Sequence, residues 1–341
     1  MKIGMLGVGG VGGVIGGYLA KADHDVTLID PWPANIERIK EAGVTVTTCE
    51  GEFTVDTTSL HLGEVAAARP AFDIVILSVK SYDTSWASKF IEPYLAPNGF
   101  VVSAQNSIND DAIADVLGWP RVVGCIVTLG AGMYEPGHPE RTSSIDQSAF
   151  ILGEPNGLIT KRLERLATVM GDVGITKTTT NLWGERWAKL AFNSMTTSVA
   201  GFTGLRSANT LSLHSDVRAL LIRIAAEVVS VAEAHGVSVE PIGTVPAHMF
   251  AQALEDGDAM AEVERLMIEA SKAIGTGRSS VAQDLLKGRA IEVDYLNGYV
   301  VCKGQQIGVP THVNQSIVDL TRRVDSGEIE PSLSNLALIG K

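Results

Sequence analysis

The chain has 341 residues, which is too long for one ordinary hydrophobic core and predicts about two domains. A hydrophobic content of 45% and a charged content of 19% are those of a globular protein and argue against disorder. The net charge of −12 argues against non-specific binding to nucleic acid or to anionic membranes, because both need a basic surface.

The first part of the chain is predicted to form a strand, a glycine-rich turn, a helix and a second strand. A short apolar run precedes the pattern G-x-G-x-x-G at Gly7, Gly9 and Gly12, apolar residues then recur at helical spacing, and a β-branched run ends at Asp30. A glycine turn alone is also compatible with other α/β proteins. In this context, with an acidic residue some 20 positions farther on, the pattern indicates a dinucleotide-binding Rossmann unit.

Each of the three glycines has a physical reason. Gly7 permits a tight turn, Gly9 lets the backbone approach a pyrophosphate, and Gly12 lets the helix pack closely on the strand. The N–H groups at the start of the helix are then directed at the anion. Further glycines inside the helix indicate close packing of its backbone, because each one lowers helix stability.

Three later apolar runs are predicted to be parallel strands that are buried on both faces. They cover residues 73–79, 100–104 and 121–127, and Lys80 and Asn106 follow the first two. Ligands of doubly wound sheets bind beyond the carboxyl ends of the strands. We therefore expect Lys80 and Asn106 to lie beside the glycine turn.

The pattern changes in the middle of the chain. Residues 131–153 resemble antiparallel strands with a turn at Pro136 and Gly137, and a polar stretch at 178–181 suggests a domain boundary. Beyond it the pattern is helical, with helices expected near 186–199, 217–234, 260–273, 281–286, 292–306 and 313–324. The predicted fold is α/β: an N-terminal Rossmann-type parallel-sheet domain at 1–180 is followed by an all-helical domain at 181–341.

Cysteine usage and the N-terminus bear on the compartment. Cys49, Cys125 and Cys302 match no metal or redox spacing, which favours reduced thiols and no metal site. Met1 and Lys2 lead directly into the first strand, and no window is apolar enough for a membrane helix. We expect a cytoplasmic protein.

A polar series in the second domain is a candidate catalytic face. Lys189, Asn193 and Thr197 are spaced i, i+4 and i+8, so they lie on one face of the predicted helix. Periodicity alone leaves a lysine that extends to the surface as an alternative.

The combined motifs resemble the ketopantoate reductase family, also called 2-dehydropantoate 2-reductases. The resemblance rests on the glycine turn, Lys80, Gln105-Asn106, the W-x-K-L-x-x-N segment at 187–193, the serine pair Ser279-Ser280, and an E-x-D-Y-x-N-G segment at 292–298. These motifs occur in family order over nearly the whole chain.

The resemblance implies a reductase with substrate bound between a Rossmann domain and a helical domain. It implies that Lys189 is the general acid and that Glu292 orients or charges it. The expected substrate-binding residues are Asn106, Asn193, Thr197 and Ser280. The expected cofactor-binding residues are Gly7, Val8, Gly9, Gly10, Val11, Gly12, Asp30, Lys80 and Asn106. Structural alternatives are a helix-terminal role for Glu292, a helix cap at Ser280 and a turn former at Asn106.

The sequence departs from the family at the cofactor and in the pocket. Family members that use NADPH usually have an arginine just after the second strand, whereas this chain ends that strand with Asp30 and continues Pro31-Trp32-Pro33. A carboxylate repels a 2′-phosphate, so NAD(H) is expected over NADP(H), with Arg38 as a possible phosphate partner. Thr197 and Ser207 stand where the family has asparagines, and Ser107 stands where it has glycine. Loss of amide donors makes the substrate uncertain.

Three functions remain open. The first is reduction of 2-dehydropantoate to pantoate in pantothenate biosynthesis. The second is an NAD-dependent D-2-hydroxyacid dehydrogenase for bulky branched or aromatic 2-oxo acids. The third is a protein that binds the dinucleotide without turnover. The expected partner is a small 2-oxo acid, with no nucleic acid and no membrane, and a homodimer is possible.

Overall fold

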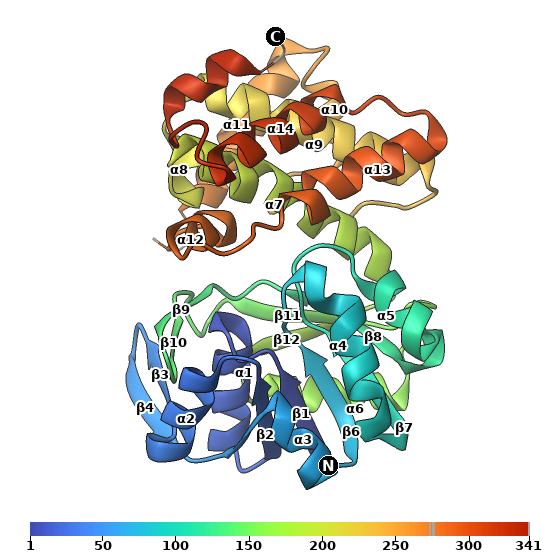
Figure 1. Ribbon diagram of the computed structural model, residues 1–341. Coiled ribbons are helices and arrows are strands. Elements are labelled where there is room, and N and C mark those ends of the chain that lie inside the picture. Colours follow the sequence, from blue (N-terminus) through green and yellow to red (C-terminus); the bar gives the residue numbers. More distant parts are fainter. Residues whose placement is uncertain (273, 275–276, 340–341) are drawn as a thin grey trace. The chain divides into compact units, whose positions relative to one another are not determined.

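The computed structural model describes residues 1–272, 274 and 277–339. The chain forms two compact units, Met1–Leu182 and Trp183–Lys341, which are described separately (Figure 1). The first unit contains both sheets, and the second unit is built of helices.

The first unit is organised around an eight-stranded sheet in the order β12-β11-β8-β7-β6-β1-β2-β5. Neighbouring strands are parallel except β8 and β11, which are antiparallel. The strands are β1 (Lys2–Leu6), β2 (Asp25–Asp30), β5 (Thr58–His61), β6 (Phe72–Leu77), β7 (Leu95–Ser103), β8 (Val122–Val127), β11 (Ser148–Gly153) and β12 (Ile175–Thr179). The three apolar runs predicted to be parallel strands are β6, β7 and β8, in the centre of the sheet.

Helices cover both faces of this sheet. Ile74 and Ile76 of β6 belong to a core that also contains residues of α1 (Gly10–Lys21) and α6 (Lys161–Gly171), whereas Val75 and Leu77 belong to a core with α3 (Leu62–Ala68), α4 (Thr84–Ile91) and α5 (Asp110–Leu117). Successive side chains of a strand point to opposite faces, so a continuous apolar run is needed where both faces are covered. The Rossmann-type prediction is confirmed.

A second sheet of four strands packs over α1. Its order is β4-β3-β10-β9, with β3 (Val44–Thr48), β4 (Gly51–Val55), β9 (Ala131–Glu135) and β10 (His138–Arg141). The turn at Pro136 and Gly137 joins β9 and β10, which are antiparallel as expected. A Cβ added to Gly13 would lie 2.8 Å from Pro139, and one added to Gly17 would lie 2.5 Å from Val46. The helix glycines therefore allow α1 to lie between two sheets.

The second unit is helical in the residues that the structure describes, apart from an isolated bridge between Ile242 and Val245. Its helices are α7 (Leu182–Thr203), α8 (Ser207–Ser212), α9 (Ser215–Ala234), α10 (His248–Gln252), α11 (Gly257–Ser271), α12 (Ser280–Leu286), α13 (Asn297–Ile307) and α14 (His312–Asp325). Five of the six expected helices are present as single helices, and α8 and α10 are additional. Residue 273, where the helix expected at 260–273 was to end, lies outside the described residues. None of the helices in the described ranges is long and apolar enough to cross a membrane.

One expected helix is divided. Residues 292–306 form a short 3-10 helix, η4 (Val293–Tyr295), followed by α13. The prediction of one continuous helix is wrong because the backbone at Leu296 has φ −98° and ψ −98°, which is outside the helical region. The division separates Glu292 from α13 by η4 and Leu296.

Candidate active site

The glycine turn connects the carboxyl end of β1 to the start of α1. Gly7 has φ +94°, and a Cβ there would lie 2.8 Å from the backbone of Ser78. A Cβ on Gly12 would overlap the carbonyl oxygen of Gly7. A Cβ on Gly9, in contrast, would meet no protein atom within 4 Å, so the space in front of Gly9 is open. This open space, at a helix start without a side-chain cap, fits the pyrophosphate of a dinucleotide.

The other members of the turn contact the protein. Val8 belongs to the hydrophobic core, and Val11 packs against it. Gly10 lies close to the backbone of Gly132 in β9, where a Cβ would be 2.9 Å away. Packing therefore accounts for these residues of the motif without any ligand.

Asp30 holds the glycine turn in place. The carboxylate accepts hydrogen bonds from the backbone N–H of Val8 at 2.5 Å and of Trp32 at 2.8 Å, and its residue is only 7% exposed. Asn35 of α2 (Pro33–Ala42) adds to this, since its Nδ2 donates to the Val8 carbonyl at 2.9 Å and its Oδ1 accepts from the Gly137 N–H at 2.7 Å. The sequence pattern identified Asp30 but gave no signal for Asn35.

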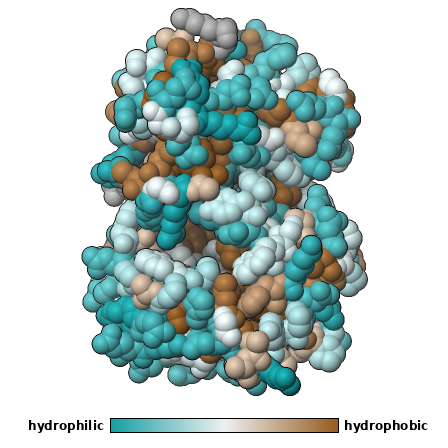
Figure 2. All heavy atoms as spheres, viewed as in Figure 1, coloured by the Kyte–Doolittle hydropathy of each residue, from teal (hydrophilic) through white to brown (hydrophobic). Residues whose placement is uncertain are grey.

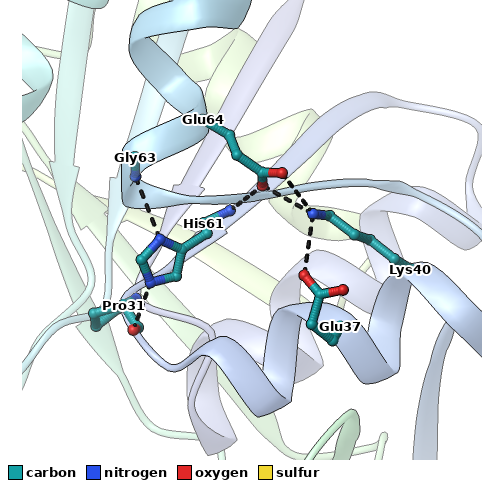
Figure 3. A network of polar contacts seen from close by, with 6 residues as sticks. All are labelled: Pro31, Glu37, Lys40, His61, Gly63 and Glu64. Atoms are coloured by element: carbon teal, nitrogen blue, oxygen red, sulfur yellow. Dashed lines mark hydrogen bonds and ion pairs between the residues drawn. The ribbon is translucent and has the colours of Figure 1, made fainter.

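A polar network lies where β2 and β5 end (Figure 3). Lys40 Nζ donates to both oxygens of Glu64, at 2.7 and 2.9 Å, and to Glu37 at 3.3 Å. The hydrogen bond from Lys40 lowers the pKa of Glu64, and the bond to Glu64 raises the pKa of Lys40. Hydrophilic side chains cover the α2 region on the face shown in Figure 2. The network is anionic overall, because two carboxylates share one ammonium.

His61 joins this network at the end of β5. Its Nδ1 accepts from the Gly63 N–H at 3.4 Å, which leaves Nε2 to donate to the Pro31 carbonyl at 3.0 Å (Figure 3). Glu64 accepts from the His61 N–H at 2.8 Å. The connection after β2, which follows Asp30, is thereby tied to the start of α3.

The loops after β6 and β7 are joined at the same edge of the sheet. The Asn106 carbonyl accepts from Ser81 Oγ at 3.4 Å and from Asn109 Nδ2 at 2.8 Å, and Gln105 Nε2 donates to the Val79 carbonyl at 2.9 Å. Lys80 lies between Val79 and Ser81 and is half-buried. Because β1, β6 and β7 are adjacent and parallel, their carboxyl ends bring the glycine turn, Lys80 and Asn106 to one edge.

Ser107 has φ +69°, a conformation that favours glycine. The departure from the family's Gln-Asn-Gly therefore falls at a position where glycine has a backbone reason. The turn keeps its left-handed backbone although the residue is serine.

In the second unit, α7 presents Lys189, Asn193 and Thr197 along one face. Asn193 and Thr197 are buried, and Lys189 is half-buried with its Nζ 5.5 Å from the centroid of the Phe192 ring. Burial lowers the pKa of the Lys189 ammonium to about 8. An ammonium with a pKa near neutrality can both hold and release a proton at physiological pH.

The start of α12 is fixed on this face. Ser279 is the helix cap, since its Oγ accepts from the Ala282 N–H at 3.2 Å, and the same hydroxyl donates to the Thr197 carbonyl at 3.2 Å. Ser280, the first residue of α12, therefore follows directly on a residue that contacts the helix of Lys189. The helix-cap role that was an alternative for Ser280 is filled by Ser279.

Glu292 precedes η4 and is buried, and its carbonyl accepts from the N–H groups of Tyr295 and Leu296. Five residues later, Asn297 Nδ2 donates to the Ser194 carbonyl of α7 at 3.3 Å. The segment of Glu292 is thereby attached to the turn of α7 that follows Lys189. Interaction between the Glu292 and Lys189 side chains stays a prediction.

A pocket of about 670 Å³ adjoins the next turn of α7, where Ala200 and Gly201 contribute to its wall. Arg206, Arg278 and Arg289 also line it. The pocket lies within the second unit and begins beyond Thr197.

The predicted residues thus fall into two groups. The first unit brings together the candidate cofactor residues at one sheet edge, and the second unit brings Lys189, Asn193, Thr197 and Ser280 to one side of α7. The sequence patterns gave no signal for Asn35, and they did not assign roles to Ser279 and Asn297, although both lie inside recognised motifs.

Two family models match the chain. The model described as "Ketopantoate reductase PanE/ApbA" matches residues 3–157, and the one described as "Ketopantoate reductase PanE/ApbA C terminal" matches residues 181–325. The 2-dehydropantoate 2-reductase of Aquifex aeolicus strain VF5 is 27% identical over 328 residues, which cover 94% of this chain and 96% of that protein.

Solved structures agree with the fold. A PanE/ApbA family ketopantoate reductase from Ralstonia eutropha JMP134 is 27% identical with a TM-score of 0.78, covering 96% of this chain and 99% of that one. A D-mandelate dehydrogenase, solved with NADH and anilino(oxo)acetate, has a TM-score of 0.81 over the same shares at 21% identity, which shows the fold alone. The chain belongs to the ketopantoate reductase family, whose enzymes are NAD(P)H-dependent oxidoreductases.

Proposed function

We propose that the protein reduces the keto group of a 2-oxo acid, with 2-dehydropantoate as the leading substrate and Lys189 as the general acid. The observation that carries this proposal is the half-buried ammonium of Lys189, with its pKa lowered to about 8, on one helix face with the buried Asn193 and Thr197. A protein that binds the dinucleotide without turnover has no need for such an ammonium.

In this mechanism a bound dihydronicotinamide supplies the hydride that reaches C2 of the substrate. Negative charge then develops on the carbonyl oxygen, and the Lys189 ammonium stabilises it and transfers its proton to that oxygen. The products are the 2-hydroxy acid and a neutral Lys189 amine, which regains a proton from solvent. Asn193, Thr197, Ser280 and Asn106 would bind the substrate, and Glu292 would orient Lys189.

We further propose that the residues of the first unit hold NAD(H) rather than NADP(H). The open space at Gly9 supports a pyrophosphate at this turn, and Asp30, whose carboxylate accepts from the Val8 N–H, would also accept from the ribose hydroxyls. Lys40, which belongs to the polar network at the ends of β2 and β5, forms ion pairs with Glu37 and Glu64. A 2′-phosphate would therefore meet carboxylates whose charges oppose it.

Arg38 does not change this proposal. Its aliphatic part packs beside Gly137, and its Nη1 is buried without a hydrogen-bond partner among the described residues. Movement of Arg38 to a 2′-phosphate would break the packing against Gly137.

A second candidate is a D-2-hydroxyacid dehydrogenase for bulky 2-oxo acids. Thr197 has a smaller side chain than asparagine and lacks its amide donor, and the pocket of about 670 Å³ begins one turn farther along α7. The D-mandelate dehydrogenase of the same fold was solved with NADH and an aromatic 2-oxo acid derivative. These observations support a larger substrate side chain.

The test is the rate of cofactor oxidation with NADH and NADPH, measured separately, for 2-dehydropantoate and for branched and aromatic 2-oxo acids. The highest kcat/KM on 2-dehydropantoate would support the leading proposal. A bulky 2-oxo acid that is better by tenfold, about 1.4 kcal/mol of transition-state binding, would replace it with the second candidate. Tight cofactor binding without turnover on any 2-oxo acid would overturn both.

The oligomeric state stays a prediction. Sedimentation equilibrium of the purified chain would distinguish a homodimer, which the sequence leaves open, from a monomer.

A further inference from the structure

Asn297 is a fully buried amide at the start of α13. Its Nδ2 donates to the Ser194 carbonyl at 3.3 Å and to Asn314 Oδ1 at 2.9 Å. The residue therefore joins α7, which carries Lys189, to α13 and α14.

The orientation of this amide is set by the groups behind it. The Glu227 carboxylate accepts from the N–H groups of Val313 and Asn314, each at 2.9 Å, and from Asn314 Nδ2 at 2.8 Å. A carboxylate can only accept, so Asn314 must direct its Nδ2 at Glu227 and its Oδ1 at Asn297. Asn297 can then meet Asn314 only with its own Nδ2, which fixes the donor that reaches Ser194.

The bond to Ser194 lies between two parts of the candidate active site. Ser194 follows Asn193 on α7, in the turn after Lys189. On the other side, Asn297 is connected to Glu292 by η4, in which the Glu292 carbonyl accepts from Tyr295 N–H at 2.9 Å and from Leu296 N–H at 3.1 Å. Two backbone hydrogen bonds of this turn therefore link the Glu292 segment to the residue before Asn297.

We propose that Asn297 is a positioning residue for the reaction, which keeps the segment of Glu292 in register with the Lys189 face of α7. This inference rests on the proposed function, in which Lys189 is the acid and Glu292 orients it. Asn297 itself touches neither substrate nor cofactor in this assignment. It acts through the backbone of α7 and through η4.

The chain offers a matched control in Asn335. This residue is also a buried asparagine that donates to a carbonyl of α7, from its Nδ2 to Phe202 at 2.9 Å, and it donates to the Glu330 carbonyl at 2.9 Å. Phe202 lies at the far end of α7 from Lys189. Asn335→Ala therefore removes the same kind of interaction from the same helix without touching the Glu292 segment.

The experiment compares Asn297→Ala and Asn335→Ala in the full chain at a temperature where circular dichroism shows both to be folded. We expect Asn297→Ala to lower kcat at least tenfold with the cofactor KM within about twofold, and Asn335→Ala to lower kcat less than about threefold. Equal losses in the two variants would show a merely structural role. Should Asn297→Ala not fold, Asn297→Ser replaces it, because serine keeps a smaller donor, and its kcat is expected to lie below those of the wild type and of Asn335→Ala.

A second measurement does not depend on turnover. The titration of Lys189 can be followed by NMR after reductive ¹³C-methylation, with Lys189→Arg to identify its signal. Loosening of the Glu292 segment in Asn297→Ala should move the pKa of Lys189 by at least about half a unit, upward where water enters and downward where the Glu292 carboxylate is withdrawn, with no change in Asn335→Ala. An unchanged titration in Asn297→Ala would overturn the positioning role. A wild type without turnover on any 2-oxo acid, but with this difference present, would overturn only the proposed function.

Discussion

The strongest prediction concerns the proton on Lys189 and its effect on the rate. If the ammonium is the acid, kcat/KM for reduction must follow its protonated fraction. With a pKa of about 8, this fraction falls from about 0.9 at pH 7 to about 0.1 at pH 9. The rate should therefore fall about tenfold, whereas an ordinary lysine with a pKa near 10.4 would lose only a few per cent over the same range.

The assay is the initial rate of reduced-cofactor consumption at low substrate, from about pH 6 to about pH 10, with the cofactor saturating at every pH. Oxidation of the 2-hydroxy acid supplies the complementary test. In that direction Lys189 must accept a proton, so kcat/KM should rise through about pH 8. The fall of kcat/KM for reduction and the rise of kcat/KM for oxidation should both have their midpoint near pH 8.

Lys189→Arg is the decisive variant, because a guanidinium keeps its charge throughout this range. We expect the alkaline decrease to disappear and the plateau to drop by about 10²- to 10⁴-fold, the usual contribution of a general acid. The reasoning would be refuted by a wild-type profile that is flat up to about pH 9.5, or by an arginine variant that keeps the wild-type limb.

Three further predictions follow from the structure. Gly9→Ala should raise the Kd for NADH at least tenfold, as measured by calorimetry. It should leave the Tm of the cofactor-free protein unchanged, because its Cβ meets no protein atom within 4 Å. Gly12→Ala should lower that Tm, because its Cβ overlaps the Gly7 carbonyl. Asp30→Asn should lower the NADH-to-NADPH ratio of kcat/KM about tenfold and also lower the Tm, because one of two backbone N–H groups loses its acceptor; an unchanged ratio would remove Asp30 from cofactor selection. Lys189→Met should stabilise the fold at neutral pH by about 1–2 kcal/mol, after allowance for the partial exposure of the side chain, since the folded state then no longer holds a buried charge. Because the pKa of Lys189 is lower in the folded than in the unfolded state, wild-type stability rises as the pH increases from about 8 to about 10.5. Denaturant titrations should therefore show the stability difference between Lys189→Met and the wild type shrinking over this range. A difference independent of pH would exclude the charge as its cause.

Much of the fold could be predicted because the signals are local. The apolar run at 73–79 and the periodic positions of α9 report burial directly, and both elements were expected at nearly their observed bounds. The second sheet could not be assembled in this way. Its β3 and β10 pair through Thr47 and Glu140, which are far apart in the sequence, and strand partners at that distance leave no periodic signal.

The candidate site shows the same limit. Residue types and spacing identified Lys189 and Asp30, but they did not predict that the Asp30 carboxylate holds the glycine turn. Asn35 and Asn297 were assigned no role, because a buried amide is explained by its partners in the folded structure rather than by its neighbours in sequence. The division at Leu296 was missed for a related reason, since apolar spacing continues across it.

The packing of α1 between two sheets affects how its glycines can change during evolution. Gly7, Gly12, Gly13 and Gly17 are each limited by neighbouring protein atoms or by a left-handed backbone, so selection for folding alone would preserve them. Among the glycines of the turn and of α1, which all lie in the described part of the chain, only Gly9 faces open space. A descendant that lost its dinucleotide would keep most of the motif and could replace Gly9 freely. Among homologues, variation at this one position is therefore the informative sign that the nucleotide has been abandoned.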